Sequence, residues 1–274
     1  MKPIPDGPKL AIVTPTFNRG ALLKRLHESL LAQDIALDWV HIVVDDGSED
    51  DSDTRHNWRD SSHLVFVKNR ENHGPLVSRN TAIDIAVEEK ADLIAFIDDD
   101  DYVTQAFFPY IKRIWKDIPG VGWYISRCKF VGPVNQEKQP WPDHDGFFDY
   151  ACDMQLDPKF TSDVLHVVST ARLGKRRFSR FGRYQREWTL LSKLARDGKF
   201  YASNDCLQVR EYLPTGLTNS RRGRAPDLIS TVNYVQRSFT ILTLAPFSVR
   251  AWHRFFRQLL AFPVRVVLFL FRPQ

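Results

Sequence analysis

The chain has 274 residues, a formal net charge of +5, and a composition that is 43% hydrophobic and 26% charged. This composition is that of an ordinary globular protein, and the length allows one large α/β domain or two small ones. The amino terminus lacks a basic stretch followed by an apolar one, so we expect no signal peptide. The three cysteines are far apart, which favours a reducing compartment and no structural zinc.

The positive charge is concentrated near the carboxyl terminus. Residues 218–274 contain nine arginines and one acidic residue, so the remaining chain carries a charge of about −3. This asymmetry indicates a basic tail on a mildly acidic body, and not a protein with a generally nucleic-acid-like surface.

Apolar runs alternate with helical patterns through the first half of the chain, which predicts βαβ units and a parallel sheet. The expected elements are strands at 10–13, 40–44, 64–67 and 93–97, and helices at 21–33 and 76–89. Each strand ends in a polar or glycine-containing segment. Ligands of open α/β sheets bind outside these carboxyl ends.

The second half is less regular. We expect partly antiparallel strands at 123–126 and 164–168, and a helix at 184–197 that ends at Gly198. Residues 132–158 contain four prolines and are expected to form a long loop, which in a compact domain is often functional.

Four consecutive aspartates, Asp98, Asp99, Asp100 and Asp101, follow the apolar strand at 93–97. Like charges this close raise one another's pKa, so a fold rarely places them at a buried strand end without a cation. Their oxygens suit Mg²⁺ or Mn²⁺, which usually takes one or two protein carboxylates together with water and phosphate. Taken alone, a solvated acidic turn explains the run equally well.

Three more polar clusters follow the other strands. They are the Pro-Thr-Phe-Asn-Arg segment at 15–19, the Asp-Asp-Gly-Ser segment at 45–48, and the Asn-His-Gly-Pro segment at 72–75 with Arg79 downstream. Each has an ordinary interpretation: Asn18 can cap a helix, and Arg79 can form a surface ion pair. Their shared position at strand ends is the more specific observation.

In this order, the segments VTPTFNR, VVDDGS, NHGPLVSRN and IAFIDDDDY resemble the inverting family 2 glycosyltransferases, which have the GT-A fold. The resemblance covers residues 9–110 strongly, and YQREWTLLSKLARDG is similar to the acceptor-side helix of that family. It implies a Rossmann-like, mostly parallel α/β sheet flanked by helices. It also implies a glycosyltransferase domain at 1–215, with a nucleotide-sugar half at 1–110 and an acceptor half at 111–215. A basic amphipathic extension at 216–274 follows.

The resemblance also implies a set of site residues. Asp46, with Asp45 beside it, would accept a hydrogen bond from a uracil or thymine ring, and Arg79 would lie near the base or the diphosphate. Asp98 would contact the ribose or the outer shell of the metal. Asp100 is the first choice as direct metal ligand and Asp101 the second choice, although the uniform run allows a shift of one residue. The donor-binding residues would be Thr14, Pro15, Thr16, Asn18, Asp45, Asp46, Asn72, Gly74, Arg79, Asp98 and Asp99.

An inverting transfer needs a general base that takes the proton of the acceptor hydroxyl. The family supplies a carboxylate at the start of a helix, and aligning LLSKLARDG puts Glu187 at that position. The chain departs from the family at Arg186, where an acidic residue is usual. A helix N-terminal residue favoured by the macrodipole is the ordinary interpretation of Glu187.

The segment 248–274 mixes aromatic and aliphatic residues with arginines, a pattern typical of a helix lying in a membrane interface. Its apolar stretch is interrupted by charged and proline residues, so we expect that it does not span a bilayer. Docking on the domain's own core, and binding of a partner, remain alternatives.

The sequence thus predicts a hexosyl- or hexosaminyltransferase of cell-envelope polysaccharide biosynthesis that uses a nucleotide diphosphate sugar, most simply a UDP-sugar, with Mn²⁺ or Mg²⁺. A glycan or lipid-linked acceptor and a peripheral position on the cytoplasmic membrane face are expected. One alternative is a nucleotidyltransferase, which typically has a glycine-rich basic loop after the first strand. A second is an inactive nucleotide-sugar-binding scaffold. Nucleic-acid binding by the tail has little further support.

Overall fold

The computed structural model describes residues 7–49, 62–131, 140–157, 163–179, 187–211 and 228–270. The strands are β1 (Lys9–Thr16), β2 (Asp38–Asp45), β3 (Leu64–Lys68), β4 (Leu93–Phe96), β5 (Tyr102–Val103), β6 (Trp123–Val131), β7 (Gly146–Phe148), β8 (Val164–Ser169) and β9 (Phe200–Glu211). The helices are α1 (Gly20–Leu31), α2 (Pro75–Glu88), α3 (Phe107–Asp117), α4 (Thr170–Leu173), α5 (Trp188–Leu194), α7 (Leu228–Leu244) and α8 (Val249–Leu270).

These strands form one mixed sheet in the order β3-β2-β1-β4-β8-β6-β9-β5, with β7 paired to β9. The pairs β3-β2, β2-β1 and β1-β4 are parallel, and β8 is antiparallel to both β4 and β6. The strand order reverses at β1, because the chain runs from β1 through β2 to β3 and then returns to β4 on the other side. A reversal of this kind opens a crevice at the carboxyl ends of the strands.

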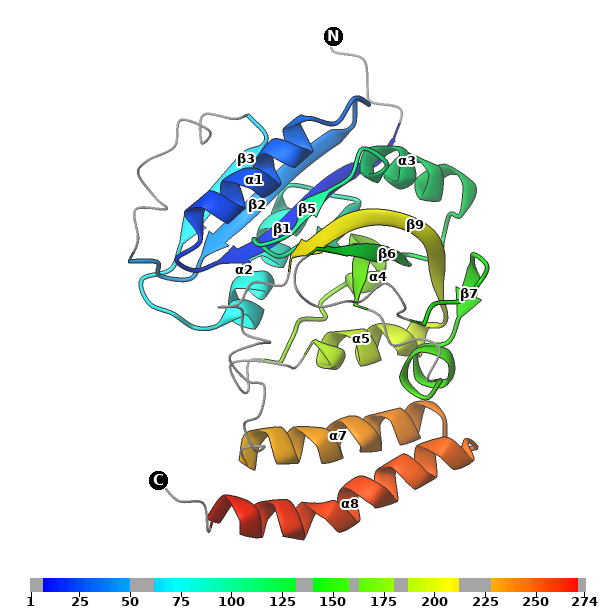
Figure 1. The fold of residues 1–274 in the computed structure, drawn as a ribbon. Helices are drawn as coiled ribbons and strands as arrows, with labels where there is room; N and C mark the ends of the chain where they lie inside the picture. Colours follow the sequence, from blue (N-terminus) through cyan, green and yellow to red (C-terminus); the bar gives the residue numbers. More distant parts are fainter. Residues whose placement is uncertain are drawn as a thin grey trace.

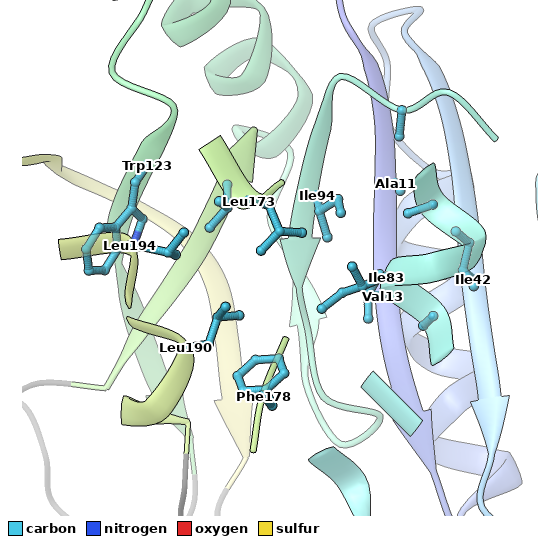
Figure 2. Packing of buried hydrophobic residues seen from close by; sticks show 14 of the residues in the cluster. Ala11, Val13, Ile42, Ile83, Ile94, Trp123, Leu173, Phe178, Leu190 and Leu194 are labelled. Atoms are coloured by element: carbon cyan, nitrogen blue, oxygen red, sulfur yellow. The ribbon is translucent and has the colours of Figure 1, made fainter. Parts of the chain in front are cut away.

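The sheet separates two hydrophobic cores, as the alternation along β1 requires (Figure 1). Ala11 and Val13 face the core that α2 and α5 cover, while Leu10 and Ile12 face the core under α1 and α3. Figure 2 shows the first core, where Ile83 of α2 lies beside β1 and β2. Helices cover both faces of this part of the sheet, so a ligand can approach it at the edge where the strands end.

The first-half elements agree with the predictions to within a few residues. The second half differs more. The expected loop at 132–158 contains β7 and a single π-helical turn at Tyr150–Gln155, and its residues 132–139 lie outside the described part. The expected helix at 184–197 begins at Trp188 and continues as a 3₁₀ turn to Asp197, and residues 180–186, Arg186 among them, are not described.

Helices α7 and α8 form a hairpin that packs on the rest of the chain. Ile241 and Leu242 of α7 meet Ala251 of α8 in a small buried cluster that also includes Ala151. The hairpin is therefore docked on the domain by α7, with α8 outside it (Figure 1). In the described part of the chain, no helix is long and apolar enough to cross a membrane.

Candidate active site

The ends of β1 and β4 meet through hydrogen bonds between the first and fourth polar clusters. Thr16 Oγ1 donates to Asp99 Oδ2 at 2.7 Å. The Arg19 guanidinium lies 3.1 Å from Asp99 Oδ1 and 2.9 Å from Asp100 Oδ2. Parallel neighbouring strands end at the same edge of a sheet, so two segments far apart in the sequence come together here.

Asp46 joins the second cluster to the third. Its Oδ1 accepts hydrogen bonds from Asn69 Nδ2, the His73 backbone N–H and Ser78 Oγ, each at 3.0 Å, and its Oδ2 accepts from the Gly74 N–H at 2.7 Å. This carboxylate therefore holds the turn before α2 in place, and both of its oxygens already have donors.

The turn after β2 lies directly against the turn before α2. Gly47 has φ +80°, and a Cβ there would lie 2.9 Å from the carbonyl carbon of Glu71 and 3.1 Å from the Asn72 nitrogen. Gly74, with φ +94°, begins α2. A larger residue at 47 would push these turns apart, so both glycines have a backbone reason to be there.

The first and second turns are also connected. The Asn18 backbone N–H donates to Ser48 Oγ at 2.8 Å, and Asn18 Oδ1 accepts from the Glu49 N–H at 2.8 Å. Ser48 in turn donates to Asp45 Oδ1 through its N–H and its hydroxyl. Asp45 is therefore a buried anchor of its own turn.

The four aspartates alternate in exposure. The side chains of Asp98 and Asp100 are 35% and 21% exposed, whereas those of Asp99 and Asp101 are 6% and 4% exposed. Asp101 accepts a hydrogen bond from Gln208 of β9, and Arg210 Nε lies 3.7 Å from its Oδ2. The two aspartates open to a ligand are thus Asp98 and Asp100.

The pKa shifts set Asp98 apart from the other three aspartates. Burial raises the pKa of Asp99 to about 7 and that of Asp101 to about 8. Burial, with Asp98 next to it, also raises the pKa of Asp100. At Asp98 burial acts in the same direction, but Arg79 and Arg210 outweigh it and hold the pKa of Asp98 below its ordinary value.

Arg79 connects the aspartate block to the predicted base. This largely buried guanidinium pairs with Asp98 Oδ1 through one nitrogen and with Glu187 Oε1 at 3.0 Å through the other. Glu187 directly precedes α5, and its side chain is 54% exposed. The structure therefore brings Glu187, Arg79 and Asp98 together from three separate parts of the chain.

The remaining predicted residues lie at the same edge but differ in exposure. Thr14 and Pro15 are buried in β1, and Thr14 Oγ1 lies 3.0 Å from His41 Nε2. Asn18 is exposed, as is Phe17 beside it. Sequence reasoning did not select Phe17 or Arg19, although both stand inside the first motif. It had no local signal for Gln208 or Arg210, which belong to the distant strand β9.

The donor set fits a divalent cation that also binds a ligand. No three His, Cys, Asp or Glu side chains of the described residues form a group that could hold a metal by themselves. Asp98 and Asp100 offer two hard oxygen donors at one strand end, and Mg²⁺ in nucleotide sites usually takes one or two carboxylates with phosphate and water. The residues present therefore suit an ion shared with a diphosphate.

A cavity of about 550 Å³ lies between α5 and α7. None of the described residues that line it is acidic, and Trp188, the residue after Glu187, is part of its wall. The lining residues are Ser179, Trp188, Thr189, Ser192, Lys193, Arg196, Gln236 and Thr240. Hydroxyl donors, two cations and an aromatic ring suit a polar or anionic ligand such as a glycan.

Comparison with known proteins identifies the family. The model of the family described as "Glycosyl transferase family 2" matches residues 11–179, which is more than half of the chain. The chain belongs to glycosyltransferase family 2. The predicted family is thus confirmed, and the matched range contains all four strand-end clusters described above.

Two curated relatives of this family 2 chain are named as glycosyltransferases. The GalNAc(5)-diNAcBac-PP-undecaprenol beta-1,3-glucosyltransferase of Campylobacter jejuni is 27% identical over 198 residues, covering 71% of this chain and 62% of that protein. The poly(ribitol-phosphate) beta-N-acetylglucosaminyltransferase TarP of Staphylococcus aureus is 34% identical over 96 residues, covering 34% of this chain and 28% of that one. The chain spans less than two thirds of either relative.

Solved structures confirm the fold. A crystal structure of S. aureus TarS residues 1–349 in complex with UDP-GlcNAc superposes with a TM-score of 0.70 at 19% identity, covering 96% of this chain and 73% of that one. The mannosyltransferase PcManGT of Pyrobaculum calidifontis, in complex with GDP-Man and Mn²⁺, superposes with a TM-score of 0.62 at 18% identity, covering 95% and 72%. The predicted α/β fold of the GT-A type, with C-terminal helices, is thus confirmed.

Proposed function

We propose that this chain is an inverting glycosyltransferase that transfers a hexosyl or hexosaminyl group from a UDP-sugar to a hydroxyl of a glycan or lipid-linked acceptor. The observation that carries the proposal is the Glu187–Arg79–Asp98 connection, which joins a candidate base to a candidate donor site. The family membership and the UDP-GlcNAc bound to a structural relative support the donor class.

In this proposal the strand-end turns bind the nucleotide. The exposed Phe17 ring and Asn18 are placed to contact the base, whereas Thr14, Asp45 and Asp46 shape the pocket from within, because they are buried and bonded to the protein. This modifies the expectation that Asp46 itself binds the base. Arg19 and Arg79 supply positive charge for the diphosphate.

Asp98 and Asp100 would hold Mn²⁺ or Mg²⁺, which when bound offsets the negative charge that the leaving diphosphate develops. Asp101 is less suited than the sequence suggested, because its side chain is only 4% exposed and Gln208 and Arg210 engage it from within. Glu187 would take the proton of the acceptor hydroxyl as the oxygen attacks the anomeric carbon from the face opposite the diphosphate. The carboxylate is half exposed, so an acceptor can reach it.

The cavity between α5 and α7 is our candidate for acceptor binding. It begins at Trp188, next to the base, and presents donors and cations without acids. A glycan that carries phosphate would suit it. The named activity of the Campylobacter jejuni relative, on an undecaprenol-linked glycan, supports a lipid-linked acceptor. A peripheral place at the cytoplasmic face of a membrane stays a prediction. The division of the chain at residue 215 stays a prediction.

The test is release of UDP from a panel of UDP-sugars in the presence of Mn²⁺. We expect turnover with at least one donor, and we expect Asp100→Asn to weaken nucleotide binding in the presence of metal. No UDP release from any donor, with unchanged binding in Asp100→Asn, would refute the proposal. Nucleotide binding without turnover, unaffected by Glu187→Gln, would instead favour the inactive scaffold. Diphosphate release from a nucleoside triphosphate would favour a nucleotidyltransferase.

A further inference from the structure

One side of α8 is apolar and exposed although the helix is docked by its other side. Leu260 is 75% exposed and Val264 60% exposed, and Phe247 in the turn before α8 is 98% exposed. The exposed apolar residues of the helix are Val249, Trp252, Phe256, Leu259, Leu260 and Val264. Successive members are mostly three or four residues apart, so they share one face, which we call the α8 stripe.

The exposure of the stripe is not due to a detached helix. Ala251 is fully buried against α7, Phe255 packs on the same cluster, and Arg254 donates to the Gln155 carbonyl oxygen at 2.6 Å. Figure 1 shows α8 as the outermost layer, with α7 between it and α5. A docked helix that still presents large apolar side chains outward has a surface typical of an interaction site.

The charge beside the stripe is entirely positive. Residues 228–270 contain five arginines and no Asp or Glu. Arg250 and Arg257 are exposed, lie seven residues apart, and have no hydrogen-bond or ion-pair partner among the described residues. Seven residues are about two helical turns, so both cations project along the same edge of the stripe.

We propose that the α8 stripe and Phe247 dock on the surface of an anionic lipid bilayer, with α8 lying in the plane of the interface. Apolar side chains would enter the boundary of the acyl chains, while Arg250 and Arg257 meet lipid phosphates. This docking is independent of the proposed reaction.

A second copy of the chain is the less suitable occupant. In a two-fold pairing of α8 helices, the stripe of one copy faces the stripe of the other. The arginines along both stripes would then gather at one interface without an acid from either hairpin to neutralise them. An anionic membrane supplies those counter-charges.

The test is co-sedimentation of the full chain with vesicles of phosphatidylcholine alone or mixed with phosphatidylglycerol. We expect binding to the mixed vesicles, and a loss of about tenfold in the double variant Leu259→Ser with Leu260→Ser. Leu31→Ser is the matched control, because Leu31 of α1 is 49% exposed and Leu259 is 44% exposed. The control should bind like the unaltered chain.

A second variant tests the charges. Arg250→Ser with Arg257→Ser should weaken binding to anionic vesicles several-fold and reduce its salt dependence, with little change on neutral ones. Circular dichroism and urea unfolding establish that each variant is folded. Absence of vesicle binding by the folded chain, or equal losses in the Leu31→Ser control, would overturn the proposal. So would a dimer in sedimentation equilibrium that the Leu259/Leu260 variant abolishes, because the stripe would then be occupied by a second copy.

Discussion

Arginines play opposite parts in the strand-end site and in the C-terminal hairpin. Around the aspartate block, Arg19, Arg79 and Arg210 each approach one or two carboxylates, and burial shields these pairs. On α8, Arg250 and Arg257 are exposed beside apolar side chains, in a hairpin that contains no acid. Arginine thus holds the carboxylates of the strand-end site in place, whereas on α8 the positive charge of Arg250 and Arg257 is available to bind an anionic partner.

The difference follows from the carboxylates, which are present in the strand-end site and absent from the hairpin. A block of carboxylates at a buried strand end is stable only with compensating cations, and the chain supplies three guanidiniums from α1, α2 and β9 or their edges. The hairpin contains no carboxylates to compensate, and its Arg250 and Arg257 remain exposed to water. Substitutions in the two regions should therefore differ in kind: loss of chemistry or folding stability in the first, and loss of partner binding in the second.

The largest expected effect is at Glu187. Glu187→Gln keeps the size of the side chain but removes the base, so turnover should fall about 10³-fold while UDP binding stays the same. Glu88→Gln, an exposed residue at the end of α2, is the control and should retain full activity. A steady-state assay of UDP release measures both. Turnover within twofold of the unaltered chain would remove Glu187 from the base role.

The next largest effects should distinguish the more exposed Asp100 from the buried Asp101. Asp100→Ala should lower turnover about 100-fold with little change in the free energy of unfolding, because Asp100 is open to a ligand. Asp101→Ala should instead lower the free energy of unfolding by about 2 kcal/mol, since it leaves Gln208 and Arg210 without their buried partner. Kinetics and urea unfolding of both variants check this. The reverse pattern would move the metal site to Asp101.

Arg79 should show how much the paired network contributes to stability. Removing a cation between two carboxylates leaves them facing each other, and we expect Arg79→Ala to cost about 2 kcal/mol, less than a fully buried pair because Glu187 is half exposed. Arg177→Ala breaks a pair with the exposed Asp84 and should cost less than about 1 kcal/mol. Urea unfolding distinguishes them, and equal costs would show that the Arg79 bridge is no stronger than a surface pair.

The sequence alone predicts the strands and helices of the parallel half of the sheet, because the patterns that identify them are local in the chain. Each apolar strand is followed at once by its polar cluster, so the motif and its place in the fold are read together. The same adjacency placed Asp98 and Asp100 at the strand end. Their alternation with Asp99 and Asp101 was not predicted, because it depends on Thr16 and Arg19 on one side and on Gln208 on the other.

The second half of the chain was harder to predict from its sequence, for a physical reason. The β9 sequence, FYASNDCLQVRE, mixes polar residues with apolar ones, and its pairing with β6 shifts register between Ser126 and Cys128. Its contribution to the site comes from pairs more than 100 residues apart, such as Gln208 with Asp101. No local pattern encodes these contacts, and the same is true of the Arg79–Glu187 pair. The hydrogen bonds that Asp46 accepts likewise depend on how the turn after β2 packs against the turn before α2.

The smallest effect on the folded chain should come from the hairpin arginines, which makes them the sharpest contrast to Arg79. Arg250→Ser with Arg257→Ser should change the free energy of unfolding by less than about 0.5 kcal/mol, because neither side chain has a partner to lose among the residues that the structure describes. Turnover on a water-soluble acceptor should also stay the same, since α7 lies between α8 and α5, the helix that Glu187 precedes. Turnover on an acceptor held in anionic vesicles should fall several-fold. Urea unfolding and the two kinetic assays measure this, and an equal fall with both acceptors would mean that the hairpin acts on the catalytic site itself.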